Sequence, residues 1–196
     1  MNPLQKKYKK EIILASRSPR RKQLLRLAGF AVTVRPSDVV EDDIINDDPV
    51  ETVLSLSREK AQDIAKDVKE GLVIGADTIV VLDEKILGKP KDHLEAFSML
   101  RTLSGRTHHV YTGFALIEKP TLVSISDYEK TAVTFRELSD WEIEAYIATK
   151  SPMDKAGAYG IQDQSAVFVN HLDGCFYNVV GFPLAKFYTC FASLVL

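Results

Sequence analysis

The amino-acid sequence predicts an α/β fold, in which helices alternate along the chain with the strands of a mixed sheet. Two observations support this class. Short apolar runs, typical of buried strands, alternate with longer segments whose apolar residues recur at the spacing of a helix face. In the second half, two long strand-like segments follow each other across a turn-forming stretch, which predicts an antiparallel pair within the sheet. We expect helices to flank this sheet and the sheet to curve around a central cleft.

The first third of the chain alternates strand and helix. Residues 12–15 form an apolar run between charged residues and a serine, which predicts a buried strand. Over residues 19–28 the leucines fall on one helical face, and Gly29 supplies a stop. A second strand is expected over 31–34. After an acidic loop, residues 49–68 predict a long helix, because their apolar side chains follow the 3.6-residue period.

The middle of the chain carries much of the candidate chemistry. Apolar segments 72–74 and 78–82 flank residues 75–77, which we interpret either as a turn or as a strand end facing a cleft. Residues 85–87 predict a short partner strand that returns after a tight turn. A helix is expected over 92–103, where the apolar residues again share one face.

The last part of the chain begins with an expected hairpin. Segments 106–117 and 122–135 are the two long strands of this hairpin. Residues 139–148 begin with a serine that is followed three positions later by a glutamate, the spacing of a capping box, and predict a helix. A short strand over 166–170, a loop from residue 178 and an amphipathic helix from Pro183 complete the expected elements.

Composition limits the class of protein. The chain has 196 residues, of which 45% are hydrophobic and 27% charged, as in an ordinary globular protein. Its net charge of −2 argues against a general nucleic-acid binder, and no apolar run approaches the roughly 20 residues needed to cross a bilayer. We therefore expect a cytoplasmic protein with neither nucleic acid nor membrane as partner. Cys175 and Cys190 are interpreted as reduced thiols, and residues 1–10 as a flexible tail.

The turn Ser16-Arg17-Ser18-Pro19-Arg20-Arg21 is the first candidate for binding. Ser18 is a natural N-cap and Pro19 a natural first helical residue, so Arg20 and Arg21 fall in the first helical turn. Positive side chains there oppose the helix macrodipole by roughly 0.3–1 kcal/mol each. A bound polyanion would offset this cost, because free N–H groups, hydroxyls and guanidinium groups all favour phosphate oxygens. The alternative is two solvated arginines on a surface helix.

Asp77 is the second candidate, because it lies inside an apolar run. A carboxylate there is costly to bury without a partner, so it either pairs with a basic residue or faces a cleft. Gly75 and Ala76 leave room for a ligand or another backbone to approach. The alternative is a structural aspartate in a turn.

The remaining candidates are individually weak. Glu41, in the acidic loop, would bind a hard cation together with Asp77 and triphosphate oxygens, although such loops are usually just solvated. Lys60, on the long helix, and Lys89, in a Gly-Lys-Pro-Lys segment, say little singly, because lysines are nearly always surface charges. Residues 154–162 are rich in small residues and predict an irregular loop. The chain has no P-loop, dinucleotide-binding or nucleophile-elbow motif, which leaves metal-assisted attack of water on phosphorus.

Taken together, these segments resemble the Maf family of nucleotide pyrophosphatases. The resemblance rests on ILASRSPRRKQLL, VIGADTIVVLDEKILGKPKD, DKAGAYGIQ and NVVGFPL, which occur in this order. It implies an elongated α/β domain over residues 11–196, with two lobes around a deep cleft, as in the inosine-triphosphatase architecture. It further implies hydrolysis between the α and β phosphates of a nucleoside triphosphate, a magnesium or manganese ion, and a homodimer.

By the same resemblance, Asp77 is the proton acceptor that activates water, and the arginines of the turn bind phosphate. The implied site residues are, for catalysis, Asp77, Glu41 and Lys89; for substrate binding, Ser16, Arg20, Arg21, Lys60, Thr78 and Gln162; and for the metal, Glu41 and Asp77.

The subgroup that hydrolyses dTTP and UTP is the most similar, and modified pyrimidine nucleotides are further candidate substrates. This interpretation rests on Arg20, Thr78 and Gln162, since a Gln amide pairs with the donor and acceptor of a pyrimidine edge. Asp163 follows Gln162, where many relatives have a glycine. The alternatives are another specificity, such as 7-methyl-GTP, and a nucleotide-binding regulator of cell division and septum formation.

Overall fold

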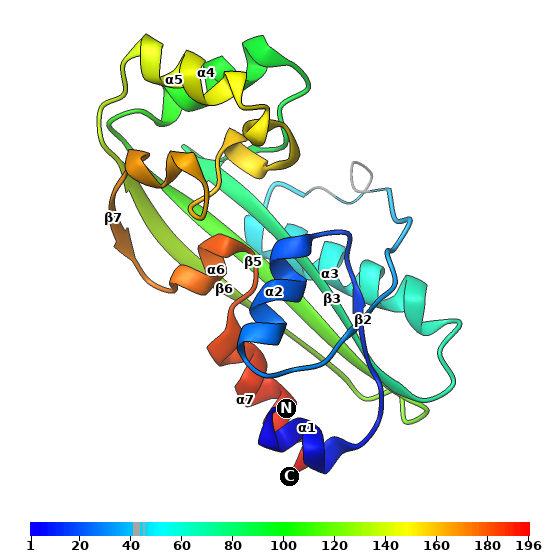
Figure 1. Ribbon diagram of the computed structural model, residues 1–196. Coiled ribbons are helices and arrows are strands. Elements are labelled where there is room, and N and C mark those ends of the chain that lie inside the picture. The colour runs from blue at the N-terminus through cyan, green and yellow to red at the C-terminus, as the bar shows by residue number, and fades with distance from the viewer. Residues whose placement is uncertain (41–43, 45) are drawn as a thin grey trace. The chain divides into compact units, whose positions relative to one another are not determined.

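The computed structural model describes residues 1–40, 44 and 46–196 (Figure 1). Within these residues, a seven-stranded sheet has the order β2-β1-β3-β5-β6-β7, and β4 pairs with β3. The pairs β1–β2 and β1–β3 are parallel, whereas β3–β4 and β6–β7 are antiparallel. The predicted α/β class with a mixed sheet and flanking helices is therefore confirmed.

The strands are β1 (Ile12–Ala15), β2 (Thr33–Val34), β3 (Gly71–Leu82), β4 (Lys85–Leu87), β5 (Thr107–Lys119), β6 (Ser124–Phe135) and β7 (Val169–Asp173). The helices are α1 (Pro3–Tyr8), α2 (Pro19–Leu27), α3 (Pro49–Ala65), α4 (His93–Leu103), α5 (Asp140–Ala148), α6 (Phe176–Val180) and α7 (Leu184–Val195), with short 3₁₀ turns η2 (Ser151–Asp154), η3 (Ala156–Ala158) and η4 (Gln164–Phe168). None of the described helices is long and apolar enough to cross a bilayer.

The chain divides into two compact units. Unit 1 contains residues 1–77, 112–129 and 181–196, and unit 2 contains residues 78–111 and 130–180. Strands β3, β5 and β6 contribute residues to both units.

In unit 1, helix α3 packs directly on the backbone of the sheet (Figure 1). A Cβ atom on Gly75 would overlap the carbonyl oxygen of Ser57, and one on Gly113 would overlap that of Val53. Only glycine allows so close an approach of the helix backbone to the strands. The room that the sequence predicted at Gly75 is thus filled by another backbone, that of α3.

An aromatic cluster around α7 forms a second packed region of unit 1. Phe30 packs edge-to-face against Phe187 and Phe191, with ring centroids 5.2 and 5.3 Å apart. Tyr8 of α1 joins this cluster, with its ring centroid 5.5 Å from that of Phe191. Such edge-to-face pairs add stability beyond the area that they bury.

The segment expected as a flexible tail differs from that expectation. Residues 3–8 form α1, whose N-terminus Asn2 caps with its side chain. The amide of Gln5 exchanges two 2.8 Å hydrogen bonds with the backbone of Ala31, and Tyr8 is buried. The contact of Tyr8 with Phe191 and the hydrogen bonds between Gln5 and Ala31 hold this segment as a helix, although its lysines suggested a solvated chain.

In unit 2, helices α4 and α5 cover a core that includes Val80, Val110, Val133 and Phe135 of the sheet. The predicted capping box of α5 is present, because Ser139 and Glu142 exchange side-chain-to-backbone hydrogen bonds. Glu142 also accepts a hydrogen bond from Arg136, which lowers the pKa of its carboxyl to about 2 together with the bonds from Ser139.

Two predictions in unit 2 were wrong. The strand expected over 166–170 begins only at Val169, because residues 164–168 form the 3₁₀ turn η4. Residues 178–180, expected as a loop, belong to the short helix α6. The buried Asn178 of this helix donates to the carbonyl oxygen of Val110 at 3.0 Å and to Thr131 Oγ1 at 2.9 Å. This side chain satisfies groups of two strands, which a local sequence pattern does not reveal.

Candidate active site

The turn after β1 lies at the same level of the sheet as Asp77. Ala15, the last residue of β1, pairs with Gly75 of the parallel strand β3. The register therefore places Ser16 beside Ala76, one residue before Asp77. Asp77 lies inside the continuous strand β3 rather than in a turn, which excludes the alternative of a turn aspartate.

Arg20 and Arg21 lie in the first turn of α2, as the sequence predicted, with Ser18 as N-cap and Pro19 as the first residue. The Arg21 guanidinium donates from Nε to the carbonyl oxygen of Gly181 at 2.9 Å. Its Nη1 atom donates to Ser16 Oγ at 3.0 Å. Ser16 Oγ also accepts from the Ser18 amide at 3.2 Å, and only 6% of Ser16 is exposed. Ser16 thus fixes both the turn and the orientation of Arg21.

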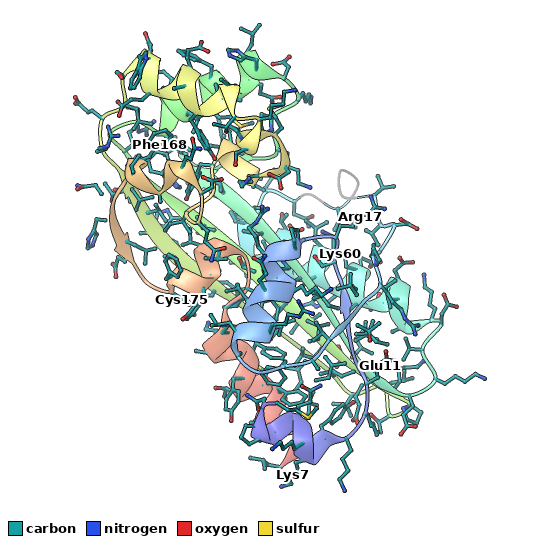
Figure 2. All side chains as sticks on the ribbon, viewed as in Figure 1. Lys7, Glu11, Arg17, Lys60, Phe168 and Cys175 are labelled. Atoms are coloured by element: carbon teal, nitrogen blue, oxygen red, sulfur yellow. The ribbon has the colours of Figure 1, made fainter. Side chains whose placement is uncertain are left out.

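Asp77 forms a buried ion pair with Lys60. Lys60 Nζ lies 2.6 Å from Asp77 Oδ1, and each side chain is only 10% exposed. Strand alternation puts Asp77 on the same face as Gly75, which is the face that α3 covers. Lys60 is one turn beyond Ser57, the residue that touches Gly75, and Figure 2 labels it on α3. The close approach at Gly75 therefore brings Lys60 to Asp77.

The pairing confirms the first of the two interpretations of Asp77, a carboxylate with a basic partner, whereas a cleft at this strand position stays a prediction. The carboxylate has a basic partner, and that partner is Lys60, which the sequence placed with the phosphates. A buried pair of this kind holds its two groups in one geometry, because each charge offsets the desolvation of the other. The structure thus brings together Ser16 with Arg21, and Lys60 with Asp77.

The other described site residues predicted from the sequence lie in unit 2. Thr78 is half-buried and follows Asp77 in β3, and Lys89 is exposed between β4 and α4. Gln162 is exposed in the turn between η3 and η4. Because this residue is exposed, its amide is accessible to a ligand.

The irregular loop before Gln162 packs on the rest of unit 2. Gly157 has a φ of 66°, and a Cβ atom there would lie 3.0 Å from methyl carbons of Val80. The Gly157 amide donates to the carbonyl oxygen of Gly88 at 3.0 Å, which ties this loop to the segment that carries Lys89. The small residues at this position are thus required by close packing within unit 2.

The chain is similar to proteins of a known family over nearly its whole length. A family model described as Maf-like protein matches residues 11–194. The chain belongs to the Maf family. A relative from Bacillus cytotoxicus is 52% identical over 90% of this chain and 92% of its own length. Relatives from Carboxydothermus hydrogenoformans (48% identical, covering 91% and 95%) and Bacillus cereus (50%, covering 90% and 86%) show a similar likeness. All three are named dTTP/UTP pyrophosphatase.

Glu41 was the second carboxylate expected in the site of this Maf protein, and it lies outside the described residues. Among the residues that the structure describes, no three His, Cys, Asp or Glu side chains gather as a metal cage. A magnesium ion that is held by one or two carboxylates and by substrate phosphates needs no such cage. Asp77, a single carboxylate beside the arginine turn, fits a metal that binds together with the triphosphate.

Sequence reasoning missed two features of unit 2. His108 is fully buried, and its Nε2 lies 2.7 Å from the hydroxyl of Tyr159 in the irregular loop. Burial, with a smaller effect of His109, lowers the pKa of His108 to about 3. The second feature is the set of hydrogen bonds around Asp163. For His108 the signal was available, since strand alternation puts it on the inner face. For Asp163 the sequence marked the position, where many relatives have a glycine, but not the distant side chains of Tyr146 and Ser151 that bond to it.

Proposed function

We propose that this Maf protein is a metal-dependent pyrophosphatase that hydrolyses dTTP and UTP to the nucleoside monophosphate and pyrophosphate. The observation that carries this proposal is the buried Lys60–Asp77 pair in register with the arginine turn. The three relatives named dTTP/UTP pyrophosphatase support the substrate, since they are about half identical over nearly the whole chain.

In the proposed reaction, Asp77 accepts a proton from water. The water oxygen then bonds to the α-phosphorus. The bond between this phosphorus and the oxygen that bridges to the β-phosphate breaks, and pyrophosphate leaves with the electron pair of that bond. Lys60 holds Asp77 in position through the 2.6 Å contact. Arg20 and Arg21 bind phosphate oxygens at the start of α2, where backbone amides also favour an anion.

The metal in this proposal is magnesium or manganese. Asp77 and Glu41 would hold it through their carboxylates, together with oxygens of the substrate phosphates. When bound, it withdraws charge from the phosphoryl oxygens and so stabilises the charge that develops during displacement. Lys89 neutralises further phosphate charge.

We propose that Gln162, with Thr78, selects the base. The amide of Gln162 offers one donor and one acceptor, which match N3–H and O4 of thymine and uracil. Cytosine presents the reverse pattern at these positions, so its pairing requires the amide to turn over. By family resemblance we also propose a homodimer, which sedimentation of the purified chain tests.

The decisive experiment is a nucleotide panel with product identification. The purified chain is assayed with Mg²⁺ or Mn²⁺ on dTTP, UTP, dCTP, ATP, GTP and 7-methyl-GTP. We expect pyrophosphate and the monophosphate from dTTP and UTP, and loss of turnover in Asp77→Asn. Asp67→Asn, which changes an exposed carboxylate of the same unit, is the matched control and keeps full activity.

Three outcomes contradict parts of this proposal. Release of orthophosphate alone moves the cleavage point away from the α–β bond. Hydrolysis of 7-methyl-GTP alone would agree with the proposed reaction but contradict dTTP and UTP as the substrates. Absence of turnover on every nucleotide, with tight nucleotide binding retained, favours the regulator over the enzyme.

A further inference from the structure

The carboxylate of Asp163 is the centre of a dense set of hydrogen bonds beside Gln162. Ser151 Oγ donates to Asp163 Oδ2 at 2.7 Å, and the Tyr146 hydroxyl lies 3.1 Å from both carboxylate oxygens. The Ser165 amide donates to Oδ1 at 2.9 Å, and Ser165 Oγ lies 2.7 Å from the same atom. Lys155 Nζ is 3.4 Å from Oδ2. Tyr146, Ser151 and Ser165 belong to α5, η2 and η4, so one side chain joins three elements of unit 2.

The same residues close the turn that presents Gln162. The Asp163 amide donates to the carbonyl oxygen of Gly160 at 3.1 Å, which makes residues 160–163 a hydrogen-bonded turn. Ser165 Oγ accepts from the Gly160 amide at 3.0 Å and lies 2.9 Å from the Gly160 carbonyl oxygen. Ile161 and Gln162 are therefore the middle residues of a turn that is closed by hydrogen bonds, several of which the Asp163 carboxylate accepts.

The other side of the turn is fixed independently. Tyr159, immediately before Gly160, is buried and bonded to His108 at 2.7 Å. The Gln162 turn is thus held at Tyr159 on one side and at Asp163 on the other, whereas Gln162 itself is exposed. Because the backbone of this turn is already held, binding of a base has to order the Gln162 side chain but not the turn.

The charge of Asp163 is part of this arrangement. Its side chain is 24% exposed. Burial raises the pKa of this carboxyl, but the hydrogen bonds from Ser151, Ser165 and Tyr146 outweigh burial and lower it. An asparagine has the same shape, but it replaces one acceptor oxygen by an NH₂ group that cannot accept from Ser151 or Ser165.

We infer that Asp163 is a positioning residue that holds the backbone turn from which Gln162 reaches the base, and thereby supports the preference for a pyrimidine with a 4-oxo group. This inference rests on the proposed role of Gln162 in base selection. It assigns no contact between Asp163 and the nucleotide.

The test is a double-mutant cycle of Asp163→Asn and Gln162→Ala, read as the ratio of kcat/KM for dTTP to that for dCTP. Contacting residues of one network couple strongly, so we expect Asp163→Asn to lower this ratio about tenfold, through KM rather than kcat. In the Gln162→Ala background, we expect Asp163→Asn to leave this ratio unchanged. Asp173→Asn, which changes an exposed carboxylate of β7 in the same unit, is the matched control.

Hydrogen exchange measures the positioning step without any activity. The exchange rates of the backbone amides of Gly160, Ser165 and Gly157 are compared between Asp163→Asn and the wild-type chain. We expect faster exchange at Gly160 and Ser165 and unchanged exchange at Gly157. If Asp163→Asn does not fold, Ser151→Ala takes its place: it removes one of the bonds to Asp163, together with the 3.2 Å bond that Ser151 Oγ accepts from Lys155 Nζ, and we expect the same pattern more weakly. Unchanged exchange at Gly160 and Ser165 overturns the inference.

The kinetic outcomes separate this inference from the proposed function. If Gln162→Ala alters the ratio and Asp163→Asn does not, Gln162 selects the base and the positioning role of Asp163 is refuted. If Asp163→Asn lowers the ratio equally in both backgrounds, it does not act through Gln162, and the inference fails. If Gln162→Ala leaves the ratio unchanged while dTTP is hydrolysed, base selection by Gln162 fails, and the positioning role for specificity fails with it.

Discussion

Replacement of Lys60 by methionine tests the central contact of the site. Lys60→Met keeps an unbranched side chain of similar length on α3 and removes the charge that faces Asp77 at 2.6 Å. The carboxylate is then left buried without its ion-pair partner. Removal of one member of a buried ion pair costs about 3–5 kcal/mol in proteins, because the remaining charge keeps its desolvation penalty. Both side chains are 10% exposed, so solvent screening reduces this cost only slightly.

The same unit contains a matched control. Lys66 forms an ion pair with Asp63 at 3.8 Å, and the Lys66 side chain is 73% exposed. Exposed pairs contribute about 0–1 kcal/mol, so Lys66→Met is expected to leave stability almost unchanged. The double variant Lys60→Met/Asp77→Asn removes both charges, and we expect it to be more stable than Lys60→Met alone.

Urea unfolding followed by circular dichroism measures these differences, and pyrophosphate release measures activity. We expect Lys60→Met to lose most of its turnover, because Asp77 loses the contact that orients it. A loss of stability no greater than that of Lys66→Met would refute the buried pair as described. Full turnover in Lys60→Met would refute the positioning of Asp77 by Lys60.

Two further predictions concern packing and pH. In Gly75→Ala the added Cβ would overlap the Ser57 carbonyl oxygen, so we expect a loss of about 3 kcal/mol in urea unfolding, whereas Gly88→Ala, with open space around it, leaves stability unchanged. The pKa of His108 falls from 6.5 to about 3 on folding, so the unfolded chain binds a proton that the folded chain does not. The stability from this group is complete above pH 6.5 and is lost as the pH falls towards 3, by up to about 1.4 kcal/mol per pH unit. We therefore expect the free energy of unfolding of His108→Gln to change less steeply with pH over that range. An equal slope in the variant would contradict the neutral, buried state of His108.

Local signals explain which elements the sequence predicts well. The boundaries of β1 and α2 agree with the structure within a residue, because a serine, a proline and a glycine mark them directly. The capping box of α5 is likewise a short-range pattern. Elements fixed by distant contacts were missed: α1 depends on Phe191 and Ala31, and α6 depends on two strands that Asn178 joins.

The same distinction applies to the candidate site. The sequence selects Asp77 because a carboxylate in an apolar run is conspicuous, and it selects Arg20 and Arg21 because their charge opposes the helix dipole. Neither argument reveals that Lys60 is the partner of Asp77, since that contact joins residues of a helix and a strand. Asp163 is equally hidden, because its role depends on side chains from α5, η2 and η4.

Gly75 connects the fold of unit 1 to its chemistry. A strand glycine near the proposed catalytic Asp77 suggests space for substrate, yet here the place of its missing side chain is occupied by the backbone of α3 at Ser57. Because Lys60 lies one turn beyond Ser57 on α3, this contact fixes the depth at which Lys60 meets Asp77 on the same face of β3. A larger residue at this position would move the helix outward and lengthen the ion pair before it touched any substrate. The glycine of the Gly-Ala-Asp sequence therefore acts through the helix, because its contact with Ser57 determines how closely Lys60 approaches Asp77.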